Sequence, residues 1–236
     1  MMLELLKGYG ILLIYFIICA SSALALRMLI TVPKEVFRKI LHMILLGSIF
    51  VLVYAFKNWW VSVIATFVFI AMVYPILMLA ERIKGYSELL TERKGGEIKK
   101  SLVLVFSMFV ILISVCWGWL GERYLVVACV LAWGLGDAAA ALIGKRFGKR
   151  HIKGKLADRK KTVEGTLAMF VVSFFSVLAV LLAYGPVVWY ACVPIAAATA
   201  AVCAIVELCS KNGIDTLTCP LSAAIIMIPL IYLLGV

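Results

Sequence analysis

Eight long apolar runs constrain what this chain can fold into more than any other feature of its sequence. Each is close to the ~20 residues that a helix rising about 1.5 Å per residue needs to cross ~30 Å of hydrocarbon. Of the 236 residues, 65% are hydrophobic and only 15% are charged, which is not typical of a soluble domain. The runs lie near residues 8–26, 37–56, 59–79, 101–120, 124–143, 162–184, 187–208 and 217–235. The sequence therefore predicts an all-α, polytopic membrane protein.

The connections between the runs predict a single bundle. Tight turns at residues 57–58 and 185–186 are typical of antiparallel neighbouring helices, and no repeat or low-complexity linker interrupts the chain. The first run ends in small residues at positions 20–25 that resemble a signal-peptide cleavage site, but its apolar core is long and we expect it to be retained. We therefore expect residues 1–236 to form one integral-membrane domain.

The Lys and Arg residues predict how the runs are oriented, because positive residues collect in short cytoplasmic loops. Twenty of the 23 lie in alternate loops, and the other three lie on the opposite side. The alternate loops are residues 27–39, 82–100, 145–161 and 211, and the other three residues are Lys7, Lys57 and Arg123. We expect both termini on the non-cytoplasmic side of a cell membrane or an endoplasmic-reticulum-type membrane.

The net charge of +11 is carried by these loops. Anionic lipid headgroups and a nucleotide are therefore better expected partners than nucleic acid. Seven cysteines are scattered through the apolar runs without a Cys-x-x-Cys pair. This pattern predicts buried thiols rather than a zinc site or a disulfide framework.

Asp137 is the acidic residue that most invites a functional interpretation. It lies seven residues before Gly144, ~10 Å inside the expected helix end, where a carboxylate is costly unless it is paired or bound to a metal. Asp137, Ala141, Gly144 and Gly148 would form one stripe of a continuing helix, with room for a ligand. The alternative is a helix-packing face of small residues, with Asp137 bridging to a neighbouring helix.

The loop at residues 145–161 holds nine Lys and Arg residues. It is not a P-loop, because three residues separate Gly144 from Gly148 and no Gly-Lys-Ser/Thr follows. Lys160 and Lys161 could add point charges for a triphosphate. The alternative is a loop that serves membrane topology alone, which explains the charge but neither the glycines nor Glu164.

The start of the sixth run suggests an anion site. Thr162 is a plausible N-cap, and it would leave the amides of residues 163–165 free for an anion at the helix N-terminus. Gly165 would let a ligand approach the backbone closely. The sequence therefore predicts phosphate binding by a construction other than a P-loop.

These residues resemble the signature of the polyprenol kinase family. The resemblance rests on Gly136-Asp137, four alanines, Gly-x-x-x-Gly, and the later Lys-Lys-Thr-x-Glu-Gly-Thr at residues 160–166. The family comprises integral-membrane enzymes, including dolichol kinases, phytol kinases and fungal-type diacylglycerol kinase, that typically use CTP to phosphorylate a lipid alcohol. The resemblance implies CTP as donor and a membrane isoprenoid alcohol as acceptor: dolichol or another polyprenol first, then phytol or geranylgeraniol.

Two further stretches resemble the family near the front of the chain. Arg38, Lys39 and His42 resemble its Arg-Lys-x-x-His, which implies that Arg38 and Lys39 contact the nucleotide phosphates. On its own, His42 is better interpreted as a buried hydrogen-bonding histidine than as a catalytic base. Residues 92–97 resemble the family's Glu-Arg-x-x-Gly-Glu, although by physics alone they would pass as a solvated charge run.

Glu207 and Asp215 flank a short loop and resemble a family pattern of Glu, Asp-Asn and Pro. Thr216 stands where Asn is common. With Asp137, the two acids could supply hard oxygen ligands for Mg²⁺, which normally takes one or two carboxylates plus phosphate oxygens. The alternative is that Asp215 is a turn residue.

The expected site combines these features on the cytoplasmic face. We expect Asp137, Glu164 and Lys161 to be catalytic, and Asp137, Glu207 and Asp215 to bind Mg²⁺ or another divalent cation. The expected nucleotide-binding residues are Arg38, Lys39, Gly144, Gly148, Lys149, Lys160, Thr162, Gly165 and Thr166.

Three alternatives remain open. They are a CTP-dependent diacylglycerol kinase, a cytidylyltransferase that forms a CDP-lipid, and a transporter of an anionic substrate. The last is disfavoured because transporters bind near the bilayer midplane, whereas these polar groups crowd one face. The sequence predicts neither the identity of the alcohol nor the oligomeric state.

Overall fold

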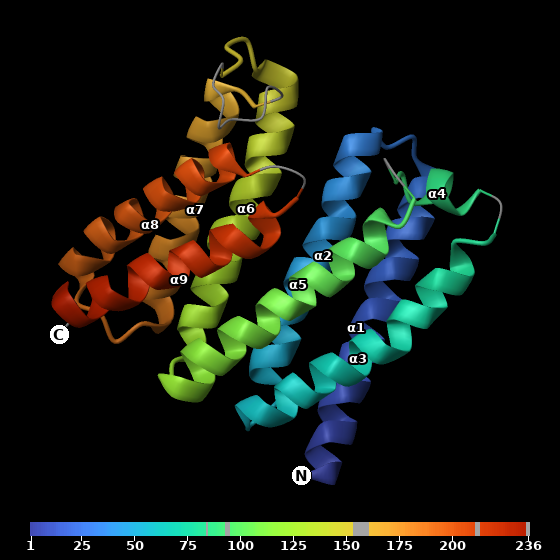
Figure 1. The fold of residues 1–236 in the computed structure, drawn as a ribbon, viewed down its shortest axis with the longest axis horizontal. Helices are drawn as coiled ribbons and strands as arrows, with labels where there is room; N and C mark the ends of the chain where they lie inside the picture. Colours follow the sequence, from blue (N-terminus) through green and yellow to red (C-terminus); the bar gives the residue numbers. More distant parts are fainter. Residues whose placement is uncertain (84, 93–94, 153–160, 211–212, 235–236) are drawn as a thin grey trace. The chain divides into compact units, whose positions relative to one another are not determined.

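The computed structural model describes residues 1–83, 85–92, 95–152, 161–210 and 213–234. The chain divides into two compact units, Met1–Leu120 and Gly121–Val236 (Figure 1). The expectation of one domain stays a prediction. All the regular elements in the described ranges are helices, which confirms the predicted all-α class.

Eight helices in the described part of the chain are long and apolar enough to cross a membrane, as predicted. In the first unit they are α1 (Met2–Leu29), α2 (Lys34–Tyr54), α3 (Trp59–Ala80) and α5 (Glu97–Leu112), which the π-helix η1 (Ile113–Trp119) continues. In the second unit they are α6 (Arg123–Phe147), α7 (Val163–Tyr184), α8 (Trp189–Cys209) and α9 (Asp215–Leu234). A short helix, α4 (Tyr86–Leu89), lies between α3 and α5. The side of the membrane on which the termini lie stays a prediction.

The end of α6 differs from the prediction. The apolar run stops at residue 143, but the helix continues to Phe147, with Lys145 and Arg146 in its last turn. Cations at a helix C-terminus interact favourably with the helix dipole, which helps to extend the helix beyond its apolar part. Asp137 therefore lies ten residues before the helix end, ~15 Å along the axis rather than ~10 Å.

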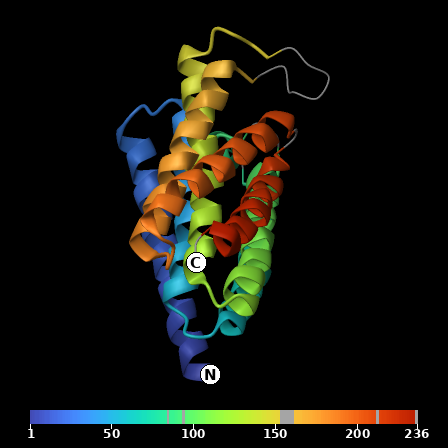
Figure 2. The same cartoon turned by 90° about the vertical axis from the view of Figure 1, so that its left-hand side faces the viewer.

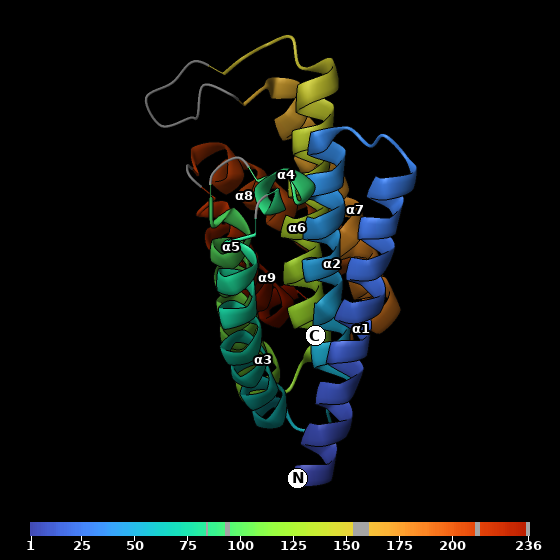
Figure 3. The ribbon, with the colours of Figure 1, turned by 90° about the vertical axis from the view of Figure 1, so that its right-hand side faces the viewer.

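The first unit is held together by aromatic packing. Helices α1 and α2 lie side by side, as do α3 and α5 (Figure 3). Phe16 of α1 stacks on Phe69 of α3 with ring centroids 4.7 Å apart, and Phe69 stacks on Phe106 of α5 at 5.1 Å. Such ring pairs contribute beyond the area that they bury. The aromatic column fixes α3 and α5 as neighbours.

In the second unit, α6 makes its most extensive contact with α7, and α7 and α9 both pack against α8 (Figure 2). Helix α9 also contacts α6, so the four helices close on one another. Because α6 and α7 are antiparallel neighbours joined through the basic loop, the end of α6 and the start of α7 come together. The end of α8 and the start of α9 also come together, where the Ser210 and Thr218 hydroxyls lie 3.2 Å apart.

Candidate functional site

Small residues on α6 form the contact face toward α7. The Ser173 hydroxyl of α7 donates a hydrogen bond to the Ala132 carbonyl at 2.6 Å. Four residues on, a Cβ atom added at Gly136 would collide with Ser173 and lie 3.1 Å from the Met169 sulfur. Spacing by four residues continues the face to Ala140 and Gly144. Gly136 and Gly144 therefore lie on a helix-packing face of small residues, whereas a bridge from Asp137 to a neighbouring helix stays a prediction.

Gly165 lies where the two backbones come closest. An added Cβ would lie 2.9 Å from the Ala140 carbonyl oxygen and 3.3 Å from Gly144 Cα. The space beside Gly165 is therefore filled by α6. The missing side chain of Gly165 thus admits the neighbouring helix, and the expectation that it also admits a ligand stays a prediction. Gly148 caps α6, donates its N–H to the Gly144 carbonyl at 3.0 Å, and packs against Thr162.

Thr162 caps α7, as predicted. Its buried side chain accepts a hydrogen bond from the Gly165 amide at 3.2 Å, the usual N-cap contact. The amide of Val163 donates to the Arg150 carbonyl at 3.0 Å. The expectation that three amides are free for an anion is therefore wrong for two of them, since both have protein partners. The Thr166 hydroxyl likewise donates to the Thr162 carbonyl at 3.2 Å.

The base of the basic loop is closed by backbone pairing. The Ile152 amide donates to the Lys161 carbonyl at 3.0 Å, and His151 and Thr162 form an antiparallel bridge. The closed base holds residues 150–152 against the start of α7. Lys149 is exposed just before the pairing. Lys160 lies outside the described residues.

Glu164 also binds the loop. Its carboxylate oxygens accept from the Arg150 amide at 3.3 and 3.4 Å. A carboxylate in the first turn is favoured by the partial positive charge of the helix N-terminus. In this structure Glu164 therefore has a positioning contact that joins the loop to α7.

Lys161 and Glu207 form an ion pair. Both residues were predicted to belong to the site, but their contact was not predicted. The Lys161 Nζ lies 2.7 Å from Glu207 Oε1, with side-chain exposures of 18% and 9%, and it also donates to the Glu207 carbonyl oxygen. The pair joins the start of α7 to the last turn of α8. A buried pair of this kind is costly to break, because either partner alone leaves a charge in a poorly solvated place.

Two thiols form reciprocal contacts between α8 and α9. The Cys203 thiol donates to the Cys219 carbonyl at 3.8 Å, and the Cys219 thiol donates to the Cys203 carbonyl at 3.7 Å. Glu207 lies one turn beyond Cys203, and Asp215 lies one turn before Cys219. Because the helices are antiparallel, both acids fall at the same end of the pair. Ser210 and Thr218 hydroxyls, 3.2 Å apart, close the same end.

The three predicted metal ligands all belong to the second unit. Glu207 and Asp215 lie at one end of the α8–α9 pair, and Asp137 lies on α6, which also contacts α9. Within the described ranges, no group of three or more His, Cys, Asp or Glu residues is arranged to hold a metal ion. The donor chemistry suits Mg²⁺ held by one or two carboxylates with phosphate oxygens, rather than by a protein cage.

Arg38 and Lys39 belong to the first unit. Arg38 Nη2 lies 2.6 Å from Glu35 Oε1, and its Nη1 lies 3.8 Å from Glu97 Oε1. Lys39 is 8% exposed, and His42 is half-buried. The guanidinium predicted to contact a nucleotide is therefore held by two glutamates, one from α2 and one from α5.

Sequence reasoning missed several residues that position this site. Arg150 acts through its backbone carbonyl and amide, which no side-chain motif reveals. Five of the seven cysteines, Cys203 and Cys219 among them, are buried as predicted, whereas Cys209 is exposed and Cys19 is half-buried. The mutual contacts of Cys203 and Cys219 were not predicted. Ser173 could have been found, because it lies eight residues after Gly165 and so shares its helix face.

The chain is 38% identical over 97 residues to a phytol kinase of Synechocystis sp. (strain ATCC 27184 / PCC 6803 / Kazusa). This similarity confirms the resemblance to the polyprenol kinase family. The match covers 41% of this chain and spans about two fifths, 40%, of the length of that relative. No protein-family model and no solved structure matches the chain.

Proposed function

We propose that this protein is a membrane-bound kinase that transfers the γ-phosphoryl group of CTP to the hydroxyl of an isoprenoid alcohol. The observation that carries the proposal is the ion pair of Lys161 with Glu207, in a unit that also holds Asp215 and Asp137 and in a chain similar to a phytol kinase. CTP as donor rests on the family resemblance. Phytol is the first acceptor to test, and dolichol, other polyprenols and geranylgeraniol follow.

Phosphoryl transfer needs mainly alignment and charge stabilisation, so a cation beside several carboxylates is a suitable arrangement. Lys161 would contact the transferred phosphate after exchanging its Glu207 partner for phosphate oxygens. Asp137 would orient the acceptor hydroxyl and take up its proton. Thr162, Gly165, Gly144 and Gly148 would form the scaffold that places Lys161.

Mg²⁺ bound by Asp215 or Glu207 would supply charge neutralisation for the triphosphate. Asp137 is the third acid of this group. Thr166, Lys149, Lys160, Arg38 and Lys39 stay proposed nucleotide contacts. Glu164 supports them by holding the basic loop through Arg150.

We further propose that the basic loop faces the cytoplasm, where the nucleotide is found. Support comes from the distribution of Lys and Arg residues between alternate loops. The acceptor would enter laterally from the bilayer, because the helices are apolar and long enough to span it.

The experiment is a transfer assay with the full chain purified in detergent. CTP, ATP, UTP and GTP, each labelled at the γ-phosphate, are offered with phytol, geranylgeraniol, dolichol, undecaprenol and diacylglycerol. We expect labelled lipid with CTP and an isoprenoid alcohol. If only diacylglycerol is labelled, the acceptor is diacylglycerol rather than an isoprenoid alcohol. If no lipid is labelled in any combination, the proposal is refuted.

A further inference from the structure

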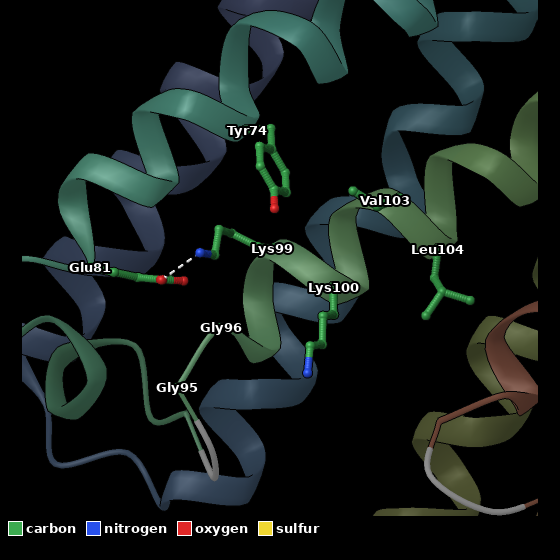
Figure 4. Close-up of a pocket in the computed structure, with 8 residues that line it drawn as sticks. All are labelled: Tyr74, Glu81, Gly95, Gly96, Lys99, Lys100, Val103 and Leu104. Carbon is green, nitrogen blue, oxygen red and sulfur yellow. Dashed lines mark ion pairs between the residues drawn. The ribbon is translucent and has the colours of Figure 1, made fainter.

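The first unit contains a hollow of about 490 Å³ that the proposed chemistry does not use. It lies between the end of α3 and the start of α5 (Figure 4). Its lining is polar toward the connecting loop and apolar one turn further along α5. The lining residues are Tyr74, Glu81, Gly95, Gly96, Lys99, Lys100, Val103 and Leu104.

Glu81 is the residue in the hollow that points to a ligand. One carboxylate oxygen, Oε2, lies 2.6 Å from the Lys99 ammonium. The other, Oε1, is buried and accepts no hydrogen bond from the described residues. A carboxylate oxygen can accept two hydrogen bonds, and leaving it buried without one costs the desolvation of that atom. The position therefore calls for a hydrogen-bond donor.

The charges around Glu81 decide which donor fits. Lys99 is already balanced by Glu81, and its amine also lies 5.7 Å from the centre of the Tyr74 ring. Lys100 adds a positive charge to the lining, but a phosphate headgroup would bring acceptor oxygens to a position that needs a donor. A neutral hydroxyl brings one donor and no charge, so it satisfies Oε1 without disturbing the ion pair.

The walls suit a molecule with an apolar chain. Val103 and Leu104 follow the lysines on α5, ~6 Å further along the helix. On α3, Ile76 and Leu79 are 54% and 58% exposed, as expected of a helix that faces lipid. A ligand could therefore keep its polar end at the loop and its chain in contact with the bilayer.

We infer that this hollow binds the hydroxyl end of a long-chain alcohol, with its O–H donating to Glu81 Oε1 and its chain along Tyr74, Val103 and Leu104. The inference rests on the proposed function for the class of alcohol. It assigns Glu81, in the charged connection between α3 and α5, to a binding site for the alcohol in the first unit, separate from the transfer step in which Asp137 would take up the hydroxyl proton. Lys99 is a positioning residue that holds the carboxylate.

A neighbouring side chain offers a competing donor. The Tyr86 hydroxyl is buried and forms no hydrogen bond with the described residues, and it interacts electrostatically with Glu81. A shift of this hydroxyl onto Glu81 would satisfy Oε1 without a ligand. Tyr86→Phe therefore separates the two accounts: it leaves alcohol binding intact if a ligand is the donor.

The test uses the full chain in detergent and a photoreactive isoprenoid alcohol that carries a diazirine near its hydroxyl end. Its phosphate ester and the matching hydrocarbon are the comparison probes. After illumination, we expect the alcohol to label α3 and α5 around the hollow, and the other two probes to label it far less. Equal labelling by the hydrocarbon, or labelling confined to other helices, would overturn the inference.

Variants test the roles of Glu81 and of the walls of the hollow. Glu81→Gln should reduce labelling and raise the alcohol KM about tenfold, the size of one lost charge-assisted hydrogen bond, with the nucleotide KM unchanged. Leu104→Trp should block the hollow, whereas Ile111→Trp, at an exposed position of the same helix, should not. A Tyr86→Phe loss equal to that of Glu81→Gln would instead assign the donor to Tyr86 and contradict the inference.

The two proposals fail separately. If the unaltered chain phosphorylates an alcohol but the hollow is not labelled, the inferred alcohol site at Glu81 is wrong and the proposed kinase activity is supported. If the alcohol labels the hollow but no nucleotide donates phosphate to it, the proposed kinase activity is wrong and the inferred alcohol site is supported.

Discussion

Replacing Lys161 with methionine should destabilise the second unit by about 3 kcal/mol. The change removes the ammonium that balances Glu207, whose side chain is only 9% exposed. Removing one partner of a buried pair typically costs about 3–5 kcal/mol. Because Lys161 is itself 18% exposed, water can reach it and the lower end applies. In a chain of this size that corresponds to a melting temperature lower by roughly 10 °C.

A thermodynamic cycle makes this prediction specific. Glu207→Leu alone should destabilise by a similar amount, because it leaves the Lys161 charge beside an apolar side chain. The double variant, Lys161→Met with Glu207→Leu, should recover most of the loss, because neither charge remains buried. Lys149→Met, at an exposed lysine of the same loop, is the matched control and should melt close to the parent.

Melting can be followed with a dye that becomes fluorescent on reaction with thiols. Five cysteines are buried in the folded chain, so unfolding exposes them. The reasoning is refuted if Lys161→Met melts with the Lys149→Met control, or if the two single losses add in the double variant.

Three other predictions test separate parts of the account. Gly165→Val should lower the melting temperature as well as turnover, because its side chain would collide with α6. If turnover is lost while the melting temperature stays that of the parent, Gly165 instead serves to admit a ligand. A cysteine at position 149 should react with a membrane-impermeant reagent from the cytoplasmic side, and one at position 57 from the other; the reverse would overturn the topology. Burial, with Glu92 and Glu81 nearby, raises the pKa of Tyr86 from 10 to about 12, so stability should fall as pH rises from 10 to 12; Tyr86→Phe should remove that component, and an identical profile in the variant would contradict it.

The number of membrane helices could be predicted from the sequence because crossing hydrocarbon requires long apolar runs. Their ends could not, since Lys145 and Arg146 extend α6 past its apolar part. Hydrophobicity marks where a helix can lie in lipid, whereas hydrogen bonding and charge decide where it ends.

The residues of the candidate site could be predicted from the sequence, but the contacts between them could not. Thr162 could be recognised as an N-cap because capping is local in sequence. The contact between Lys161 and Glu207 depends on how α7 and α8 pack, which no local pattern encodes. Gly165 was ambiguous, because a missing side chain admits a ligand or a neighbouring helix equally well.

The hollow beside Glu81 was missed for a related reason. Residues 92–97 looked like a solvated charge run, and Glu81 stood outside the motif. Only the fold shows that Lys99 takes one oxygen of Glu81 and that the other is buried.

The most direct test of the central claim is product analysis with the parent and Asp137→Asn. CTP labelled separately at the α- and γ-phosphates is incubated with phytol and the purified full chain. The account predicts γ-label on the lipid and CDP as the second product. It also predicts that Asp137→Asn melts like the parent but loses transfer by at least about a hundredfold, the scale of positioned proton transfer. Release of pyrophosphate with α-label on the lipid, or near-parental turnover by Asp137→Asn, would contradict it.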